Sequence, residues 1–201
     1  RSHNFSHANF SFLECDLSQP NEIEKLKFPE FLDEVTLINN AGIIGNIKRL
    51  SDQIESDLQE VLNINVTSPI LLMKLIYSKI EDKSKFTVVN ISSGAANRAI
   101  PSWAGYCASK AALNMLTETF YLEELEKENH PTVYAVSPGV IDTDMQVQIR
   151  TADPNDFSSL KNFKELKSSD SLFSPDDAAK RLFKLLNSTF EGRIFQDLRS
   201  F

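Results

Sequence analysis

A tyrosine and a lysine four residues apart near the middle of this 201-residue chain, Tyr106 and Lys110, form a pair suited to proton transfer. Four residues are about one turn of an α-helix, so the two side chains share a helix face. A free tyrosine releases its proton near pH ~10, and a neighbouring ammonium lowers that pKa because it favours the phenolate. The alternative is an ordinary pair on a helix surface, and the surrounding residues decide between the two.

The residues before this pair predict a strand that ends in two serines. The run 88–91 is apolar and rich in β-branched residues, which is typical of a buried strand. Ser92 and Ser93 follow it, and open α/β sheets bind ligands at the carboxyl ends of their strands. We expect Ser93 to hold a substrate carbonyl oxygen, which Tyr106 protonates as hydride reaches the carbon, or the reverse reaction.

Ser93, thirteen residues before Tyr106, and the run Tyr-Cys-Ala-Ser-Lys at 106–110 together resemble the catalytic core of the short-chain dehydrogenase/reductase family. The resemblance extends from about Phe10 to the C-terminus. Four further segments match in family order: Cys15-Asp16-Leu17, Asn39-Asn40-Ala41-Gly42, Asn63-Ile64-Asn65-Val66 and the run from Ser137 to Met145. The resemblance implies an oxidoreductase of the alcohol/carbonyl type that uses a nicotinamide dinucleotide.

The resemblance also implies which residues bind the dinucleotide. Asp16 would approach the adenine, although an aspartate there could equally cap a helix. Lys110 would bind the nicotinamide ribose and Thr143 the carboxamide. The implied cofactor-binding set is Asp16, Leu17, Asn40, Ala41, Gly42, Tyr106, Lys110, Gly139, Ile141 and Thr143. NADP(H) is expected over NAD(H), and an arginine such as Arg1 often meets the 2′-phosphate, although Arg1 could equally be a solvated loop residue.

Asn65 is the expected fourth catalytic residue beside Ser93, Tyr106 and Lys110. Pro69 lacks an amide proton, so it interrupts the helical pattern and frees a carbonyl near Asn65. In the family such a carbonyl holds a water that relays protons to the lysine. Asn63 is the competing candidate, and an asparagine exposed on a helix surface is the plain alternative.

The order of elements predicts one α/β domain over residues 1–201, with a Rossmann-like, doubly wound parallel sheet between two helical layers. Strands are expected at 10–15, 35–38, 86–91, 133–136 and 192–196. Helices are expected at 20–26, 54–80, from 106 to about 127, and from Ser174 onward, where Pro175 is a favourable first residue. No Gly-x-x-x-Gly-x-Gly turn follows a strand, so we expect the family's first strand, helix and strand to be missing upstream and the strand at 10–15 to lack its neighbour.

The segment 146–170 is polar with isolated large apolar residues, and we expect it to form a lid over the substrate. Its phenylalanines could instead serve as plain packing residues. Asp142 and Asp144 are expected to cap the helix that follows them. The expected substrate contacts are Ser93, Trp103, Gly139 and Met145.

The runs 142–146 and 150–166 and the Tyr-Cys-Ala at 106–108 are most similar to those of sepiapterin reductases and bacterial benzil reductases. That resemblance implies NADPH-dependent reduction of one ketone of a vicinal dicarbonyl. Gln196 and Asp197 flank the position of the carboxylate that binds pterin, one residue out of register, which puts pterin recognition in doubt. The alternatives are a reductase of an unrelated ketone or alcohol, and a catalytically silent dinucleotide sensor or scaffold.

Composition limits which classes of binding partner we expect. The net charge of -7 argues against nucleic acid or an anionic membrane as the main partner, and no apolar run is long enough to span a bilayer. The only cysteines, Cys15 and Cys107, lie within predicted elements, so we expect reduced core thiols in a cytoplasmic protein and no metal site. The resemblance implies a homodimer or homotetramer assembled through the two long helices, although their apolar stripes could equally be core.

Overall fold

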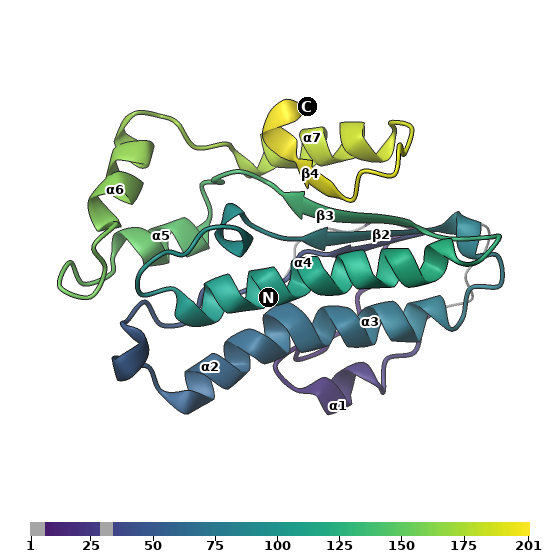
Figure 1. The fold of residues 1–201 in the computed structure, drawn as a ribbon, viewed down its shortest axis with the longest axis horizontal. Helices are drawn as coiled ribbons and strands as arrows, with labels where there is room; N and C mark the ends of the chain where they lie inside the picture. Colours follow the sequence, from purple (N-terminus) through teal and green to yellow (C-terminus); the bar gives the residue numbers. More distant parts are fainter. Residues whose placement is uncertain (1–6, 29–33) are drawn as a thin grey trace.

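A parallel β-sheet forms the middle of the molecule (Figure 1). The computed structural model describes residues 7–28 and 34–201. Four strands lie side by side in the order of the chain: β1 (Val35–Asn39), β2 (Phe86–Ile91), β3 (Thr132–Ser137) and β4 (Phe195–Asp197). All three strand pairs are parallel, so all carboxyl ends meet at one edge of the sheet. The expected strand positions after Val35 are confirmed, with β4 shifted toward the C-terminus.

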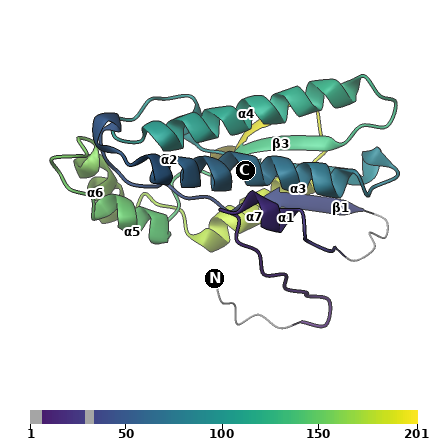
Figure 2. The same ribbon diagram turned by 90° about the horizontal axis from the view of Figure 1, so that it is seen from below.

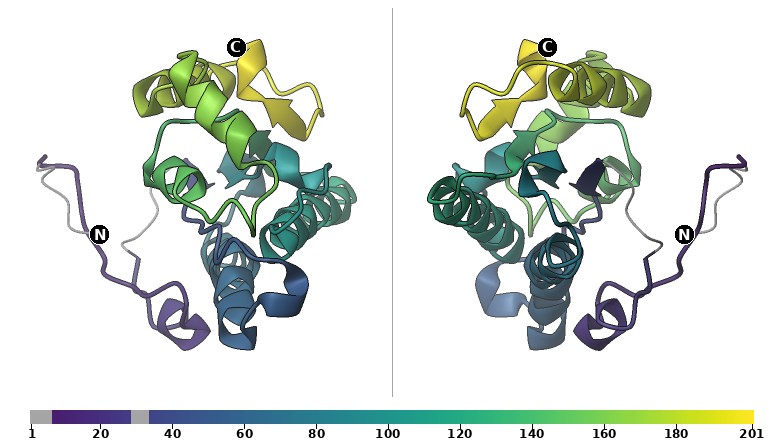
Figure 3. Two further views of the ribbon diagram at one scale, coloured as in Figure 1. Left: turned by 90° about the vertical axis from the view of Figure 1, so that its left-hand side faces the viewer. Right: turned by 90° about the vertical axis from the view of Figure 1, so that its right-hand side faces the viewer.

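Helices cover both faces of the sheet, as the end-on views in Figure 3 show. One face carries α3 (Ser68–Tyr77) and α4 (Ala104–Leu125), and the other carries α7 (Pro175–Leu186). Neighbouring strand residues face opposite layers: Val88 packs in the cluster with α3 and α4, and Val89 packs in the cluster with α7. This arrangement confirms the predicted three-layer, Rossmann-like fold. The predicted start of α7 with Pro175 as its first residue is also confirmed, and the Ser174 hydroxyl caps it by accepting a hydrogen bond from the amide of Asp177 (3.1 Å).

The remaining helices are shorter or interrupted. The long helix expected at 54–80 consists of α2 (Glu55–Leu62), a π-helical turn η2 (Asn63–Thr67) and α3. The shorter elements are α1 (Pro20–Ile23), η1 (Leu50–Asp52), η3 (Lys83–Lys85), η4 (Gly94–Ala96), α5 (Asp144–Arg150), α6 (Leu160–Ser168) and η5 (Leu198–Ser200). α1 is therefore shorter than the helix expected at 20–26.

A chain of buried polar side chains crosses the sheet from β1 to α4. The amide of Asn39 donates to the side-chain oxygen of Asn90 (2.7 Å), which faces it in the parallel register. Asn90 in turn donates to the hydroxyl of Thr117 (2.8 Å), and Thr117 donates to the carbonyl of Leu113 (2.6 Å). All three polar side chains are buried, so their hydrogen bonds offset the desolvation of groups that the core otherwise disfavours.

Two expectations for the N-terminal part are wrong. Residues 10–15 form no strand, and Phe12 and Leu13 are about half exposed. A strand requires a neighbour to pair with, and among the described residues β1 pairs only with β2; Figure 2 shows the N-terminal segment running away from the sheet. Cys15 and Cys107 are both half-buried rather than core thiols, and neither is in a disulfide. Arg1 lies outside the described residues.

Within residues 7–28 and 34–201, no helix is both long and apolar enough to cross a membrane. The same part of the chain holds no group of three or more potential metal-binding side chains.

Candidate active site

Tyr106 and Lys110 lie on the first two turns of α4, and both are buried, with 7% and 4% of their surface exposed. The predicted shared face is confirmed. The Lys110 ammonium donates a hydrogen bond to the carbonyl of Ile91 (2.8 Å), the last residue of β2. It lies 5.8 Å from the centre of the Tyr106 ring. The end of β2 therefore holds Lys110 beside the phenol.

The protonation of this pair differs from the expectation. Burial raises the pKa of Tyr106, a side-chain hydrogen bond with Ser93 lowers it, and Cys107 nearby raises it. Burial lowers the pKa of Lys110 to about 8. The expected depression of the Tyr106 pKa by the Lys110 ammonium is not found, because burial dominates and the ammonium is directed at the Ile91 carbonyl. The site thus holds a neutral phenol and, at neutral pH, a cation that releases its proton easily.

Ser93 lies at the carboxyl end of β2, as expected. It caps the short helix η4, where its hydroxyl accepts a hydrogen bond from the amide of Ala95 (3.1 Å). Accepting this bond leaves the proton of the Ser93 hydroxyl available for donation. The side-chain hydrogen bond with Tyr106 places the two hydroxyl groups next to each other. A carbonyl oxygen bound there would meet two hydroxyl donors.

Asn65 is fully buried in the π-helical turn and is held by three hydrogen bonds. Its side chain accepts from the amide of Ile43 (2.9 Å) and donates to the Ile43 carbonyl (2.8 Å) and to the Ser109 hydroxyl (3.0 Å). Pro69 lies four residues after Asn65 and cannot donate to the carbonyl of Asn65 as a regular helix would require. The wider turn and the missing donor agree with the predicted interruption.

Asn63, the competing candidate, points elsewhere. Its side chain donates to the carbonyl of Ser18 (3.0 Å) and accepts from Gln59 (2.9 Å), so it attaches the helix to the loop before α1. Asn65 lies on the side of Lys110, and Asn63 does not share its contacts.

Gly42 brings the loop after β1 against this pair of side chains. A Cβ atom on Gly42 would lie 3.3 Å from the Asn65 side-chain oxygen and 3.4 Å from the Lys110 ammonium nitrogen. The loop can come this close only because glycine lacks the Cβ. Asn40 and Ala41, just before it, are exposed, so their backbone is accessible to a ligand at the carboxyl edge of the sheet. Residues 40–42 therefore border the carboxyl edge of the sheet next to Lys110.

The loop after β3 contributes the other expected cofactor residues. Gly139 adopts a left-handed conformation (φ 81°), and a Cβ there would lie 3.0 Å from the Phe173 ring. Ile141 pairs with Phe173 in an isolated bridge, and the exposed Thr143 precedes α5. These residues, the loop around Gly42 and Ser93 all follow the carboxyl ends of adjacent parallel strands, so the fold collects them at one edge.

Asp16 and Leu17 lie beside the start of α3. The Leu17 carbonyl accepts a hydrogen bond from Ser68 (2.6 Å). The exposed Asp16 carboxylate accepts from the amide of Ser18 (2.9 Å), and this backbone hydrogen bond lowers its pKa. The carboxylate is therefore ionised and fixed by a local turn.

The predicted capping by Asp142 and Asp144 is wrong. Thr143 occupies the cap position of α5 without a side-chain cap hydrogen bond, and Asp144 is the first helical residue. Asp142 instead accepts from Lys167 of α6 (2.7 Å) and Arg150 of α5 (3.4 Å). The hydrogen bond from Lys167 is the main cause of the lowered pKa of Asp142. Asp142 therefore joins the two helices of the segment 144–168.

That segment consists of α5, α6 and the turns between them, and it packs on Trp103. Phe157 and Phe163 are buried, and with Trp103 and Tyr106 they belong to one apolar cluster; Met145 packs against it. Trp103 is only 6% exposed. The alternative that the phenylalanines of this segment are packing residues is therefore confirmed for Phe157 and Phe163. Sequence reasoning missed Ser109, which bonds Asn65 from within the Tyr-x-x-x-Lys motif.

The sequence is similar to those of known proteins. Residues 2–154 match the family model described as short chain dehydrogenase. Benzil reductase ((S)-benzoin forming) of Bacillus subtilis (strain 168) is 38% identical over 206 aligned positions, which cover 98% of this chain and 84% of that protein. Sepiapterin reductase of Bos taurus is 37% identical over 187 aligned positions, which cover 89% of this chain and 63% of that protein.

Solved structures of similar proteins share the fold. A short-chain dehydrogenase/reductase from Saccharomyces cerevisiae has a TM-score of 0.77 at 26% identity, over 92% of this chain and 75% of that one. A 4-hydroxyisoleucine dehydrogenase complexed with NADH has a TM-score of 0.71 at 25% identity, over 92% and 75%. The chain therefore belongs to the short-chain dehydrogenase/reductase family and is an oxidoreductase of that type.

Proposed function

We propose that this protein is an NADPH-dependent carbonyl reductase that reduces one ketone of a vicinal dicarbonyl, with Tyr106 as general acid. The observation that carries the proposal is the grouping of the buried Tyr106, Lys110 and Asn65 with the half-buried Ser93 at the carboxyl edge of the sheet. The nicotinamide, when bound, supplies the hydride. The protein must then bind the ketone, orient it and deliver one proton to its oxygen.

In the proposed mechanism, Ser93 and Tyr106 donate hydrogen bonds to the ketone oxygen. Burial keeps the phenol of Tyr106 protonated, so it can give its proton as negative charge develops on that oxygen. Lys110, whose pKa is about 8, can return a proton to the phenolate that forms. The carbonyl of Asn65, which Pro69 leaves without its helical donor, is suited to hold the water that resupplies Lys110.

The substrate class is supported by the chain's relatives and by the site. The relatives include a Bacillus benzil reductase and a bovine sepiapterin reductase, and benzil is a vicinal diketone. Segment 146–170 is proposed as a lid over such a substrate. The Asp197 carboxylate is already bound by the guanidinium of Arg199 (2.9 Å and 3.0 Å from Nε). This ion pair favours an apolar benzil-like diketone over a pterin, with Ser93, Gly139 and Met145 as proposed contacts.

We expect the Tyr106→Phe variant to lose about 10²–10⁴-fold in turnover, because general acid catalysis contributes about that much. NADPH binding should remain close to wild type. The assay follows the loss of NADPH absorbance with benzil, a small aliphatic diketone and sepiapterin, with NADH in parallel. A Tyr106→Phe variant that stays active would contradict the assignment. Tight NADPH binding without turnover of any carbonyl would instead support a dinucleotide sensor.

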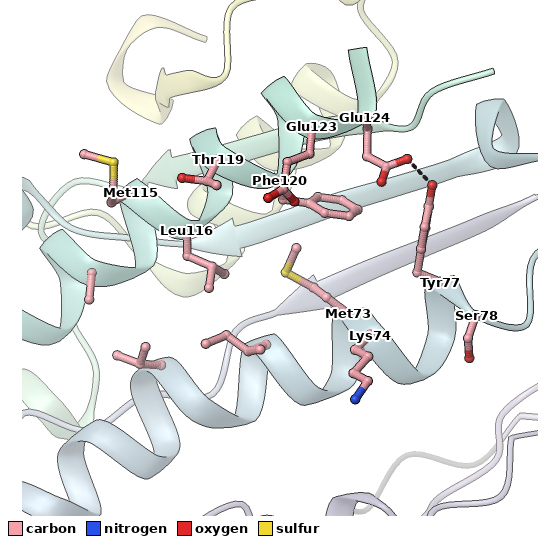
Figure 4. A pocket seen from close by; sticks show the side chains of 13 residues that line it. Met73, Lys74, Tyr77, Ser78, Met115, Leu116, Thr119, Phe120, Glu123 and Glu124 are labelled. Atoms are coloured by element: carbon pink, nitrogen blue, oxygen red, sulfur yellow. Dashed lines mark hydrogen bonds between the residues drawn. The ribbon is translucent and has the colours of Figure 1, made fainter. Parts of the chain in front are cut away.

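We also propose that the protein is cytoplasmic and self-associates through α3 and α4. An apolar groove of about 780 Å³ lies between these helices, with Met73, Leu116 and Phe120 pointing into it (Figure 4). Met115 beside it is 63% exposed, and an exposed apolar groove of this kind suits a second copy of the chain. We expect Met115→Asp to reduce the molar mass measured by light scattering toward that of one chain, and an unchanged mass would contradict the interface.

A further inference from the structure

An aromatic cluster of four side chains, Trp103, Tyr106, Phe157 and Phe163, connects the segment 144–168 to the phenol of the candidate active site. The Trp103 ring stacks on Phe157, with centres 5.5 Å apart and planes 14° apart. It also contacts Phe163 (5.1 Å) and meets the Tyr106 ring edge-on (5.6 Å, 85°). Such aromatic pairs have defined geometry, so a shift of one ring displaces the next.

The backbone at Ser102 and Trp103 strengthens this connection. Ser102 is buried in a left-handed conformation (φ 71°), and its hydroxyl donates to the carbonyl of Asp156, next to Phe157. A left-handed serine is strained and persists only where its surroundings hold it. Trp103 occupies the cap position of α4, and its carbonyl accepts from the amide of Cys107 (2.8 Å). Two adjacent residues thus bind the segment 144–168 and begin the helix that carries Tyr106.

The other end of the segment contacts the opposite side of the site. Gln148 of α5 donates to the carbonyl of Gly45 (2.9 Å), and Ile149 is buried in the same apolar cluster as Ile44. Ile44 directly follows Ile43, the partner of Asn65. The segment therefore contacts both the loop after β1 and the start of α4.

We propose that Trp103 is a positioning residue, which transmits the packing of segment 144–168 to Tyr106 and holds the phenol in place for proton transfer. The inference rests on the function proposed above and assigns Trp103 a role other than substrate contact. Trp103 is 6% exposed in this arrangement, so its ring is covered by Phe157 and Phe163. Loss of the packing should therefore reduce the rate of the chemical step more than it weakens substrate binding.

The test is a Phe157→Ala variant, because Phe157 contacts Trp103 and Phe163, the rings through which the segment reaches Tyr106. We expect kcat to fall about 10- to 100-fold, as a small misplacement of a catalytic group does, with a smaller change in KM and an unchanged Kd for NADPH. The matched control is Leu185→Ala, since Leu185 is equally buried (1%) but lies on α7. It should leave kcat within about twofold of wild type. A raised KM at unchanged kcat for Phe157→Ala would overturn the proposal.

A Trp103→Phe variant separates positioning from direct recognition. It keeps an aromatic ring for Phe157 and Tyr106 but removes the indole N–H, which is buried without a partner among the described residues. Turnover within a few-fold of wild type supports positioning by the ring. A loss of turnover in Trp103→Phe with normal turnover in Phe157→Ala would overturn it, because the indole N–H would then act on the substrate.

A second readout does not depend on turnover. The absorbance of tyrosinate is titrated in wild type and in Phe157→Ala, and again in the same two proteins with Tyr106→Phe added. The difference between each pair of curves follows Tyr106 alone. Since burial is the main cause of the raised Tyr106 pKa, Phe157→Ala should admit water and shift this titration to lower pH. The charged or titratable neighbours, Lys110 and Cys107 on α4 and Asp57 across a small cavity shared with α2, are unchanged in that variant. An unshifted titration would overturn the proposal; a wild type inactive on every dicarbonyl would refute only the proposed function.

Discussion

Replacing Asn65 by alanine tests both the fold around the site and the choice between the two asparagines of the π-helical turn. Three hydrogen bonds are lost, to the amide and carbonyl of Ile43 and to Ser109. At about 1 kcal/mol net for each bond, the free energy of unfolding should fall by about 3 kcal/mol. For a domain of about 200 residues this corresponds to roughly 6–12 °C in melting temperature.

The matched control is Asn63→Ala on the same turn. Asn63 makes two side-chain hydrogen bonds, but it is only half-buried, so water can replace them. Its loss should cost about 1 kcal/mol or less and leave turnover near wild type. The unfolding free energies come from urea denaturation, and kcat is measured at a temperature where both variants are fully folded.

Two results would refute this reasoning. Equal destabilisation by the two variants would mean that the buried hydrogen bonds of Asn65 contribute no more to the free energy of unfolding than the half-buried ones of Asn63. A folded Asn65→Ala variant with wild-type kcat would show that Asn65 supports the loop at Ile43 without serving proton transfer.

Two further predictions concern the partners of Gly42. Because burial lowers the pKa of Lys110 to about 8 from 10.5, the unfolded chain binds more protons than the native state between these pH values. The unfolding free energy of wild type relative to Lys110→Met should therefore rise with pH across that range, while turnover falls above pH about 8; a flat difference would contradict the buried ammonium. Gly42→Ala places a Cβ against Asn65 and Lys110 and should weaken NADPH binding about tenfold by fluorescence titration. Gly94→Ala, where a Cβ meets nothing within 4 Å, should leave the affinity unchanged.

The sequence was sufficient to predict the central strands, because β2 and β3 are apolar runs buried on both faces. It also predicted the shared face of Tyr106 and Lys110 from their spacing and the helix interruption from Pro69. These features depend on local periodicity or on a residue's own covalent chemistry. Contacts with distant parts of the chain change these features little.

Other features could not be predicted because they depend on distant partners. The run 10–15 alternates like a strand, but pairing requires a neighbour that local sequence does not supply. Asp142 was assigned to a helix cap, whereas Lys167, 25 residues away, binds its carboxylate. The pKa of Tyr106 was expected to fall because Lys110 is near in sequence, but desolvation by surrounding side chains outweighs that proximity.

The polar chain from Asn39 through Asn90 to Thr117 has a consequence for how the site is aligned. The other side chains of β1 and β2 are mostly apolar and would tolerate a shifted pairing better than these amides do. A slip of one residue would turn the amides to the opposite faces and leave them buried without partners, at a cost of about 1–3 kcal/mol for each group. The two amides therefore fix the register of β1 against β2. The fixed register places the loop at Gly42 next to Ser93, so that the ends of both strands can contact the same ligand.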